Sequence, residues 1–202
     1  MLERAGRVVA IILAAGESRR FGGHKLLAPL EGKPLVQHVI DAATGSQVDE
    51  VVLVVGHAAA DVLAAVRLGR ARTVVNPDYA AGHSTSLRAG LREAASADAV
   101  VVLLGDQPFV TSALIDALVD RQRSGGAAAV VCSWRGHRSP PTLLRRDLWP
   151  ELDRLTGDVG AREALAGRSD VAMLEVTGPL GSLDDVDRPD DLARLERPDA
   201  PA

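Results

Sequence analysis

The chain has 202 residues and a formal net charge of −4, and its basic residues form no long run. This length suits one domain over residues 1–202, with residues 197–202 as a frayed tail, and the charge pattern argues against nucleic-acid binding. Hydrophobic residues make up 47% of the sequence but aromatic residues only 2%, so the core must consist of Val, Leu, Ile and Ala. Such a core is typical of a parallel sheet covered by helices.

The predicted elements alternate along the chain. Apolar runs without polar alternation are expected to be strands buried on both faces, and they begin at Val8, Val51, Ala99 and Ala127. Helical spacing of apolar residues appears between them, at residues 35–40, 62–66, 87–91 and 114–118. This order predicts an α/β fold: a Rossmann-like, doubly wound, mostly parallel sheet with helices on both faces and a ligand site at the carboxyl ends of the strands.

The C-terminal part is less regular. Residues 135–144, RGHRSPPTLL, are rich in proline and are predicted to form a loop. We expect further elements in the order helix, turn, short helix, strand and helix, at residues 146–155, 156–160, 161–166, 171–176 and from about 189.

Other features of the sequence argue against a membrane-spanning segment, a signal peptide and a zinc site. The longest apolar stretch, Val8 to Ala15, is too short to span a bilayer, and the residues before it lack the layout of a signal peptide, so we expect a cytoplasmic protein with no membrane partner. Cys132 is the one cysteine of the sequence and is expected to be a buried apolar side chain. The five histidines form no i,i+4 pair and have no cysteine partner, which argues against a zinc site.

A candidate phosphate-binding loop follows the first strand, in LAAGESRRFGGHK at residues 13–25. It fits neither G-x-G-x-x-G nor the P-loop pattern. Small residues at 14–16 would let the backbone approach a ligand, and Arg20 and Lys25 could place positive charge on a polyphosphate. Both are expected to project from a surface loop. The alternative is a glycine-containing turn with two solvated cations.

Two acidic positions are candidate magnesium ligands. Asp106 follows a buried strand, at the edge where such a sheet binds its ligand, and Mg²⁺ needs few protein carboxylates. Asp187, in LDDVDRP, is the candidate second ligand, with Asp185 as an alternative. The structural alternatives are an Asx-type turn before Pro108 and a cap on the helix that starts near residue 189.

A third segment, residues 76–88 (NPDYAAGHSTSLR), leads from a strand end into a helix. Its three hydroxyls, on Ser84, Thr85 and Ser86, could bind a base, ribose or phosphate at the helix N-terminus. A solvated N-cap would account for one of them.

Together, LAAGESRRFGGHKLL, NPDYAAGHSTSLRAGL, GDQPFV, TGDVGAR and LDDVDRPDDL resemble the MobA-like nucleotidyltransferase family, and most closely its molybdenum cofactor cytidylyltransferase branch. The resemblance spans nearly the whole chain. It implies that Mg²⁺ is held by Asp106 and Asp187, and that the catalytic residues are Arg20, Lys25, Asp106 and Asp187. The nucleotide-binding residues it implies are Leu13, Ala14, Ala15, Gly16, Lys25, Asn76, Ser84 and Ser86.

The resemblance also implies the substrates. Guanylyl-transferring relatives tend to carry LAGG where this chain has LAAG, so Ala15 favours CTP over GTP. The implied reaction transfers CMP from CTP to a phosphorylated small cofactor such as molybdenum-loaded molybdopterin and releases pyrophosphate. The implied partner that receives the product is a molybdoenzyme apoprotein. Many cytidylyl relatives have Gly-His-Pro and an apolar run where this chain has residues 139–144, SPPTLL.

Three alternatives remain open at this stage. One is a guanylyltransferase of the same family, and another is an NAD(P)-dependent oxidoreductase on the same fold, since a relative in this superfamily is a nicotinamide-dependent oxidoreductase. The third is a nucleotide-binding regulator without catalysis.

Overall fold

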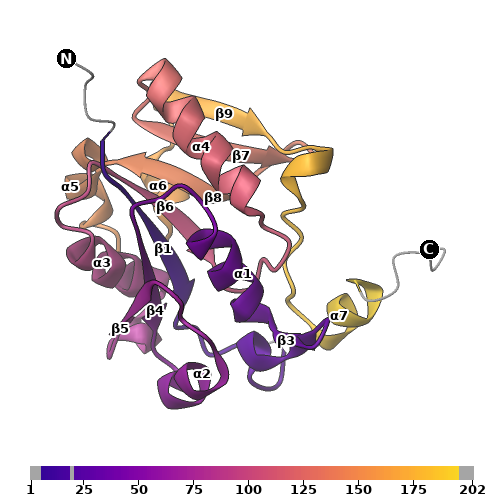
Figure 1. Ribbon diagram of the computed structural model, residues 1–202. Coiled ribbons are helices and arrows are strands. Elements are labelled where there is room, and N and C mark those ends of the chain that lie inside the picture. The colour runs from indigo at the N-terminus through magenta and orange to yellow at the C-terminus, as the bar shows by residue number, and fades with distance from the viewer. Residues whose placement is uncertain (1–5, 19–20, 196–202) are drawn as a thin grey trace.

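The central feature of the computed structural model, which describes residues 6–18 and 21–195, is a seven-stranded sheet with the order β5-β4-β1-β6-β8-β7-β9 (Figure 1). Its strands are β1 Val8–Ala14, β4 Glu50–Val55, β5 Ala71–Val75, β6 Ala99–Leu104, β7 Ala129–Trp134, β8 His137–Arg145 and β9 Val171–Glu175. Neighbouring strands are parallel except that β8 runs antiparallel to β6 and β7. The predicted mostly parallel α/β sheet is therefore confirmed. A separate hairpin joins β2 Pro29–Leu30 and β3 Lys33–Pro34.

Helices cover both faces of this sheet (Figure 1). They are α1 Leu35–Thr44, α2 Ala59–Ala65, α3 His83–Glu93, α4 Ser112–Gly125, α5 Trp149–Leu152, α6 Ala161–Ala164 and α7 Pro189–Leu195. Apolar residues of α1, α2 and α4 pack on one face, and those of α3 and α5 on the other, where Leu165 joins them just after α6. Helix α3 can lie close to β1 because Gly90 has no side chain: a β carbon there would collide with Ile11. Within the described ranges, no helix combines the length and apolar character needed to cross a bilayer.

Strand β1 shows why an unbroken apolar run forms the middle of the sheet. Ala10 and Ile12 belong to the core on one face, while Val9 and Ile11 belong to the core on the other. All four are at most 1% exposed. Because both faces are covered at these four positions, a polar side chain there would lack hydrogen-bond partners, and each buried Val or Ile contributes roughly 1.5–3 kcal/mol.

The prediction of a loop at residues 135–144 is wrong, since most of that segment forms β8 in the interior of the sheet. The prolines are accommodated by an irregularity. Cys132 of β7 pairs with Ser139 and Val131 with Thr142, so Pro140 and Pro141 lie in a bulge, and β6 pairs with β8 only from Thr142 onward. The missing N–H groups of the prolines therefore interrupt no regular ladder.

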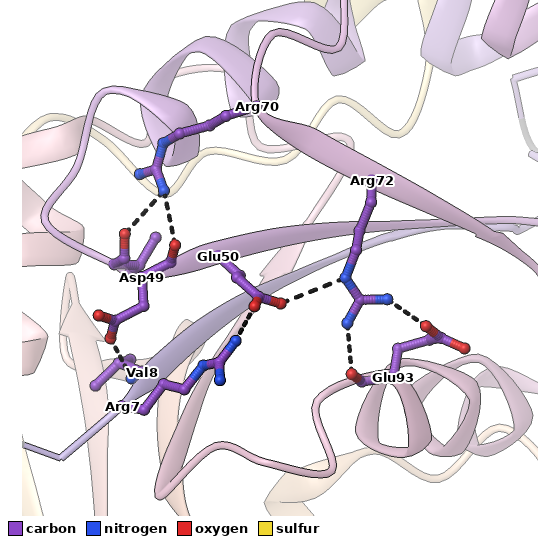
Figure 2. A network of polar contacts seen from close by, with 8 residues as sticks. Arg7, Val8, Asp49, Glu50, Arg70, Arg72 and Glu93 are labelled. Atoms are coloured by element: carbon purple, nitrogen blue, oxygen red, sulfur yellow. Dashed lines mark hydrogen bonds and ion pairs between the residues drawn. The ribbon is translucent and has the colours of Figure 1, made fainter.

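A polar network joins the amino ends of β1, β4 and β5 (Figure 2). Glu50 forms ion pairs with both Arg7 and Arg72, and Arg72 continues to Glu93 at the end of α3. The carboxylate of Asp49 accepts a hydrogen bond from the backbone N–H of Val8 at 2.7 Å. We call these contacts the amino-edge network. In its ion pairs, the two arginines Arg7 and Arg72 balance the charges of the two acids Glu50 and Glu93.

Candidate active site

A cavity of about 480 Å³ opens at the carboxyl ends of β1 and β6. The N–H of Gly105 donates to the carbonyl of Leu13 at 3.0 Å, so the segments that follow these two strands lie side by side. The loop that the sequence singled out forms much of the wall. Its lining members include Leu13, Ala14, Ala15, Gly16 and Lys25.

Lys25 lies at the centre of the charged groups in this cavity. It begins a 3₁₀ turn, Lys25–Leu27, and its Nζ lies 2.5 Å from Oδ2 of Asp106 and 3.2 Å from Oδ1 of Asp187. Only 8% of the residue is exposed, so the expectation that Lys25 projects from a surface loop is wrong. Burial alone would lower the pKa of Lys25, but the carboxylates of Asp106 and Asp187 outweigh it and the pKa is raised.

The contacts of Lys25 bring together two carboxylates that are far apart in the sequence. Since one ammonium nitrogen touches both, Asp106 and Asp187 are close enough for a single cation to bridge them. A backbone hydrogen bond from the N–H of Val186 to the carbonyl of Asp106, at 3.1 Å, holds the two segments together. The C-terminal segment is thereby tied to the end of β6.

A third carboxylate, Asp185, also lines the cavity. Burial of its carboxyl group, followed by the negative charge of Asp106, raises the pKa of Asp185 to about 6. A hydrogen bond from Gln107 acts in the opposite direction. Asp185 and Asp187 both face the same space, so the geometry admits either of them as a partner of Asp106.

The cavity as a whole is rich in negative charge. Among its described lining residues, Lys25 is the one lysine or arginine, whereas the acids are Glu17, Asp106, Asp158, Asp185 and Asp187. Arg20 lies outside the described residues, so its predicted contact with a polyphosphate stays a prediction. The carboxylates of Asp106, Asp158 and Asp185 by themselves outnumber the one ammonium group of Lys25, and such an arrangement favours the binding of a further cation.

The predicted hydroxyl segment divides into residues that reach the cavity and residues that do not. Ser86 lines it, whereas Asn76 and Ser84, at 3% and 0% exposure, are not among the lining residues. The amide of Asn76 donates to the hydroxyls of Thr85 and Ser86 at 2.9 and 3.0 Å. Asn76 therefore orients the first turn of α3, and the geometry does not favour its direct contact with a nucleotide.

Sequence reasoning passed over Tyr79 and Asp158, which line the cavity from the NPDY and TGDVG motifs. These motifs meet in space: Gly82, with φ of +111°, packs so tightly on Gly157 that a β carbon would overlap it. The N–H of Ser84 donates to the carbonyl of Gly157 at 3.1 Å. The available signal was that both residues stand inside motifs that carry the resemblance, NPDYAAGHSTSLRAGL and TGDVGAR.

Gln107 was also missed. It is fully buried directly after Asp106, and its Nε2 donates to Oγ of Ser139 at 3.2 Å and towards the carbonyl of Leu183 at 3.5 Å. Gln107 thus connects the end of β6 to β8 and to the acidic C-terminal segment. The available signal was an amide side chain directly after Asp106 in G-D-Q-P at a predicted strand end, because a polar group that becomes buried there requires hydrogen-bond partners.

The donor set fits a small divalent cation. The oxygens of Asp106 and Asp187 already converge on one positive charge, that of Lys25. In the described part of the chain, no three His, Cys, Asp or Glu side chains form a ready-made metal site. A cation here would take its remaining ligands from water and phosphate, as Mg²⁺ commonly does.

Residues 10–172 match the family of the MobA-like NTP transferase domain. The chain belongs to this family. It is a nucleotidyltransferase of the MobA-like type, as its motifs indicated.

Similar proteins agree with this membership. The purine catabolism protein PucB of Bacillus subtilis is 31% identical over 96% of this chain and 98% of its own length. The nicotine blue oxidoreductase of Paenarthrobacter nicotinovorans is 30% identical over 93% and 96%. Among solved structures, Rv0371c of Mycobacterium tuberculosis superimposes with a TM-score of 0.83 and 32% identity over 95% of this chain and 98% of that one. Rv0371c has also been solved in complex with manganese.

Proposed function

We propose that this protein transfers CMP from CTP to a phosphorylated small acceptor, molybdopterin in its molybdenum-loaded form, and releases pyrophosphate. The observation that carries the proposal is the convergence of Asp106, Asp187 and buried Lys25 at the wall of the cavity beside the glycine loop. A polyphosphate with a divalent cation supplies both charges that such a site needs.

In the proposed reaction an oxygen of the acceptor's phosphate forms a bond to the α-phosphorus of CTP. The bond from that phosphorus to the α,β-bridging oxygen breaks, and pyrophosphate leaves with the electron pair. The attacking oxygen is already anionic, so no side-chain nucleophile is required. Catalysis then depends on positioning and on neutralising charge.

Asp106 and Asp187 would hold the divalent cation, with Asp185 as the alternative second ligand. When bound, Mg²⁺ would neutralise charge on the phosphate oxygens. The manganese complex of Rv0371c supports a divalent cation in a related protein. Because Lys25 contacts the same carboxylates, the cation would compete with it, and the ammonium group of Lys25 would become available to the triphosphate.

The proposed preference for CTP rests on Ala15, which relatives that transfer GMP tend to replace by glycine. Ala15 is 3% exposed and lines the cavity. Its methyl group and Cβ of Tyr79 both pack against Gly56, so closely that a β carbon on Gly56 would overlap them. We infer that its methyl group influences which base is bound, because it sets the position of this part of the cavity wall. Replacing Ala15 by glycine should therefore relax the preference by about 1 to 3 kcal/mol at most.

The test is a thermal-shift comparison of CTP, GTP, ATP and NADPH, each with and without Mg²⁺, followed by measurement of pyrophosphate release with molybdopterin. A ligand at 100 times its Kd should stabilise the protein by roughly 2.7 kcal/mol. We expect the largest shift with CTP and Mg²⁺. An equal or larger shift with GTP would refute the assignment of the base.

The nicotine blue oxidoreductase, 30% identical over most of both chains, favours a second candidate, an NAD(P)-dependent oxidoreductase. Such an enzyme should bind NADPH without a divalent cation. A shift with NADPH alone, together with no pyrophosphate release from any nucleoside triphosphate, would support it over nucleotidyl transfer.

A further inference from the structure

A small apolar cluster lies outside the two main cores, where α7 approaches the β2–β3 hairpin (Figure 1). Its buried members are Leu30, Leu35 and Val186, and the side chains that pack against them include Phe21, Phe109 and Leu192. The sequence has two phenylalanines, and both belong to this cluster, which we call the hairpin cluster. Phe21, Phe109 and Val186 stand close in sequence to the three charged residues that meet in the active-site cavity. The cluster therefore joins the segments that carry those charges.

Asp187 depends on its neighbours in the chain for its position. Its side chain is 52% exposed, so the surrounding side chains cover only part of it. The residue before it, Val186, is fully buried in the hairpin cluster, and the N–H of Val186 donates to the carbonyl of Asp106 at 3.1 Å. Val186 therefore fixes the chain on the N-terminal side of Asp187.

Asp191 fixes the chain on the other side. Its Oδ2 accepts hydrogen bonds from the backbone N–H of Asp187 at 3.0 Å and from that of Arg188 at 2.7 Å. Asp191 is the third residue of α7, which begins at Pro189, and an acidic side chain at that position can reach back to the N–H groups at the start of a helix. The N–H of Asp191 donates in turn to the carbonyl of Arg188 at 3.0 Å. The backbone at Asp187 is thus tied to the first turn of α7.

Leu192 fixes where α7 itself lies. Its side chain packs against the buried members of the hairpin cluster. With seven residues, α7 is too short to be a stable helix by itself, so its place depends on such contacts with the rest of the chain. Of two consecutive residues, Asp191 holds the backbone of Asp187 and Leu192 docks the helix. The position of Asp187 is therefore connected to the hairpin cluster through α7.

We propose that Asp191 is a positioning residue for the metal site. Through its two hydrogen bonds to the backbone it holds Asp187 with the carboxylate towards Asp106, and it acts on the cation only through that ligand. The inference rests on the proposed function and deepens it, because it favours Asp187 over Asp185 as the second ligand. A ligand that is already held in place loses less conformational freedom when the cation binds.

The experiment measures the binding of Mn²⁺ to the full chain without nucleotide, from the electron paramagnetic resonance signal of the free ion. Asp191→Ala removes the acceptor of both N–H groups and should weaken Mn²⁺ binding by about tenfold. Asp191→Asn keeps a side-chain oxygen that can accept them, so its affinity should stay within about twofold of the wild type. Hydrogen exchange at the amides of Asp187 and Arg188 should be faster in Asp191→Ala than in the wild type.

The matched control is Asp190→Ala, which removes the same charge from the exposed neighbouring position of α7 and should leave the affinity for Mn²⁺ within about twofold of the wild type. Leu192→Ala keeps the carboxylate of Asp191 but loosens the docking of α7, and it should weaken Mn²⁺ binding as well. Equal affinity in the wild type and Asp191→Ala would overturn the inference. An equal loss in Asp190→Ala would also overturn it, because the effect would then belong to charge.

Pyrophosphate release from CTP with molybdopterin, measured on the same samples, separates this inference from the proposed function. A wild type that binds Mn²⁺, with the expected loss in Asp191→Ala, but releases no pyrophosphate would count against nucleotidyl transfer and leave the role of Asp191 standing. Release by the wild type together with equal Mn²⁺ affinity in all variants would support the transfer and refute the role of Asp191.

Discussion

The two edges of the sheet differ in how their acidic and basic side chains are balanced. In the amino-edge network, Glu50 is shared by Arg7 and Arg72, and Arg72 also reaches Glu93 (Figure 2). At the carboxyl edge, Asp106, Asp185 and Asp187 face Lys25. Matched charges hold strands in place and need no ligand. Carboxylates in excess of cations are costly unless a further cation arrives, so the imbalance is the reason we propose that the reaction takes place at the carboxyl edge.

The largest expected effect tests this contrast with one type of substitution. Asp106→Asn should lower turnover by about 100-fold or more, because it removes a charge that the transition state requires. Pyrophosphate release from CTP is the measurement. Asp49→Asn, at the amino edge, is the matched control and should leave turnover unchanged while lowering the melting temperature, since Asp49 accepts from the N–H of Val8. Similar turnover in the two variants would remove the functional distinction between the edges.

Removing the cation at each edge sharpens the comparison. Lys25→Met leaves the carboxylates of Asp106 and Asp187 facing one another, so the protein without ligand should lose about 2 kcal/mol of stability. Added Mg²⁺ should restore it. Arg72→Met should cost about 1 kcal/mol, because its pairs are exposed, and Mg²⁺ should restore nothing. Urea unfolding with and without MgCl₂ measures both, and a Lys25→Met variant insensitive to Mg²⁺ would argue against a shared cation.

A smaller effect is expected from Asp185, whose pKa is raised to about 6, mainly by burial and then by Asp106. A carboxyl group with a raised pKa destabilises the fold when it ionises, so its contribution to stability is present below about pH 4 and is lost as the pH rises towards 6. Asp185→Asn should therefore raise the melting temperature at pH 7 by about 2 to 4 °C. The gain should vanish near pH 4. A gain that did not depend on pH would contradict the charge-based explanation.

The smallest expected effect concerns the interior between the two edges. Cys132 of β7 is fully buried, and burial raises the pKa of its thiol to about 12. The thiolate that reacts with disulfide reagents is therefore almost absent at neutral pH. We expect no reaction of the folded protein with 5,5′-dithiobis(2-nitrobenzoic acid), and one thiol per chain after denaturation in urea. Rapid labelling of the folded protein would show that the sheet opens locally.

Much of the fold could be predicted because its signals are local. The apolar runs at Val8, Val51 and Ala99 lack polar alternation since both faces of the sheet are covered, and that pattern can be read without knowing the partners of each strand. Strand β8 could not be predicted in this way. Pro140 and Pro141 normally argue against an interior strand, and only the bulge opposite Val131 and Cys132 accommodates them.

The sequence by itself placed the glycine loop and Asp106 at strand ends, because chain order and strand direction decide which edge such residues occupy. Only the tertiary structure decided that Asp187, 81 residues further on, meets Asp106 at Lys25. It also decided that the amide of Asn76 binds hydroxyls of α3, whereas Ser86 reaches the cavity. Burial of Lys25 was likewise decided by packing. A side chain's partners depend on distances between elements, and a local pattern of residues carries no record of those distances.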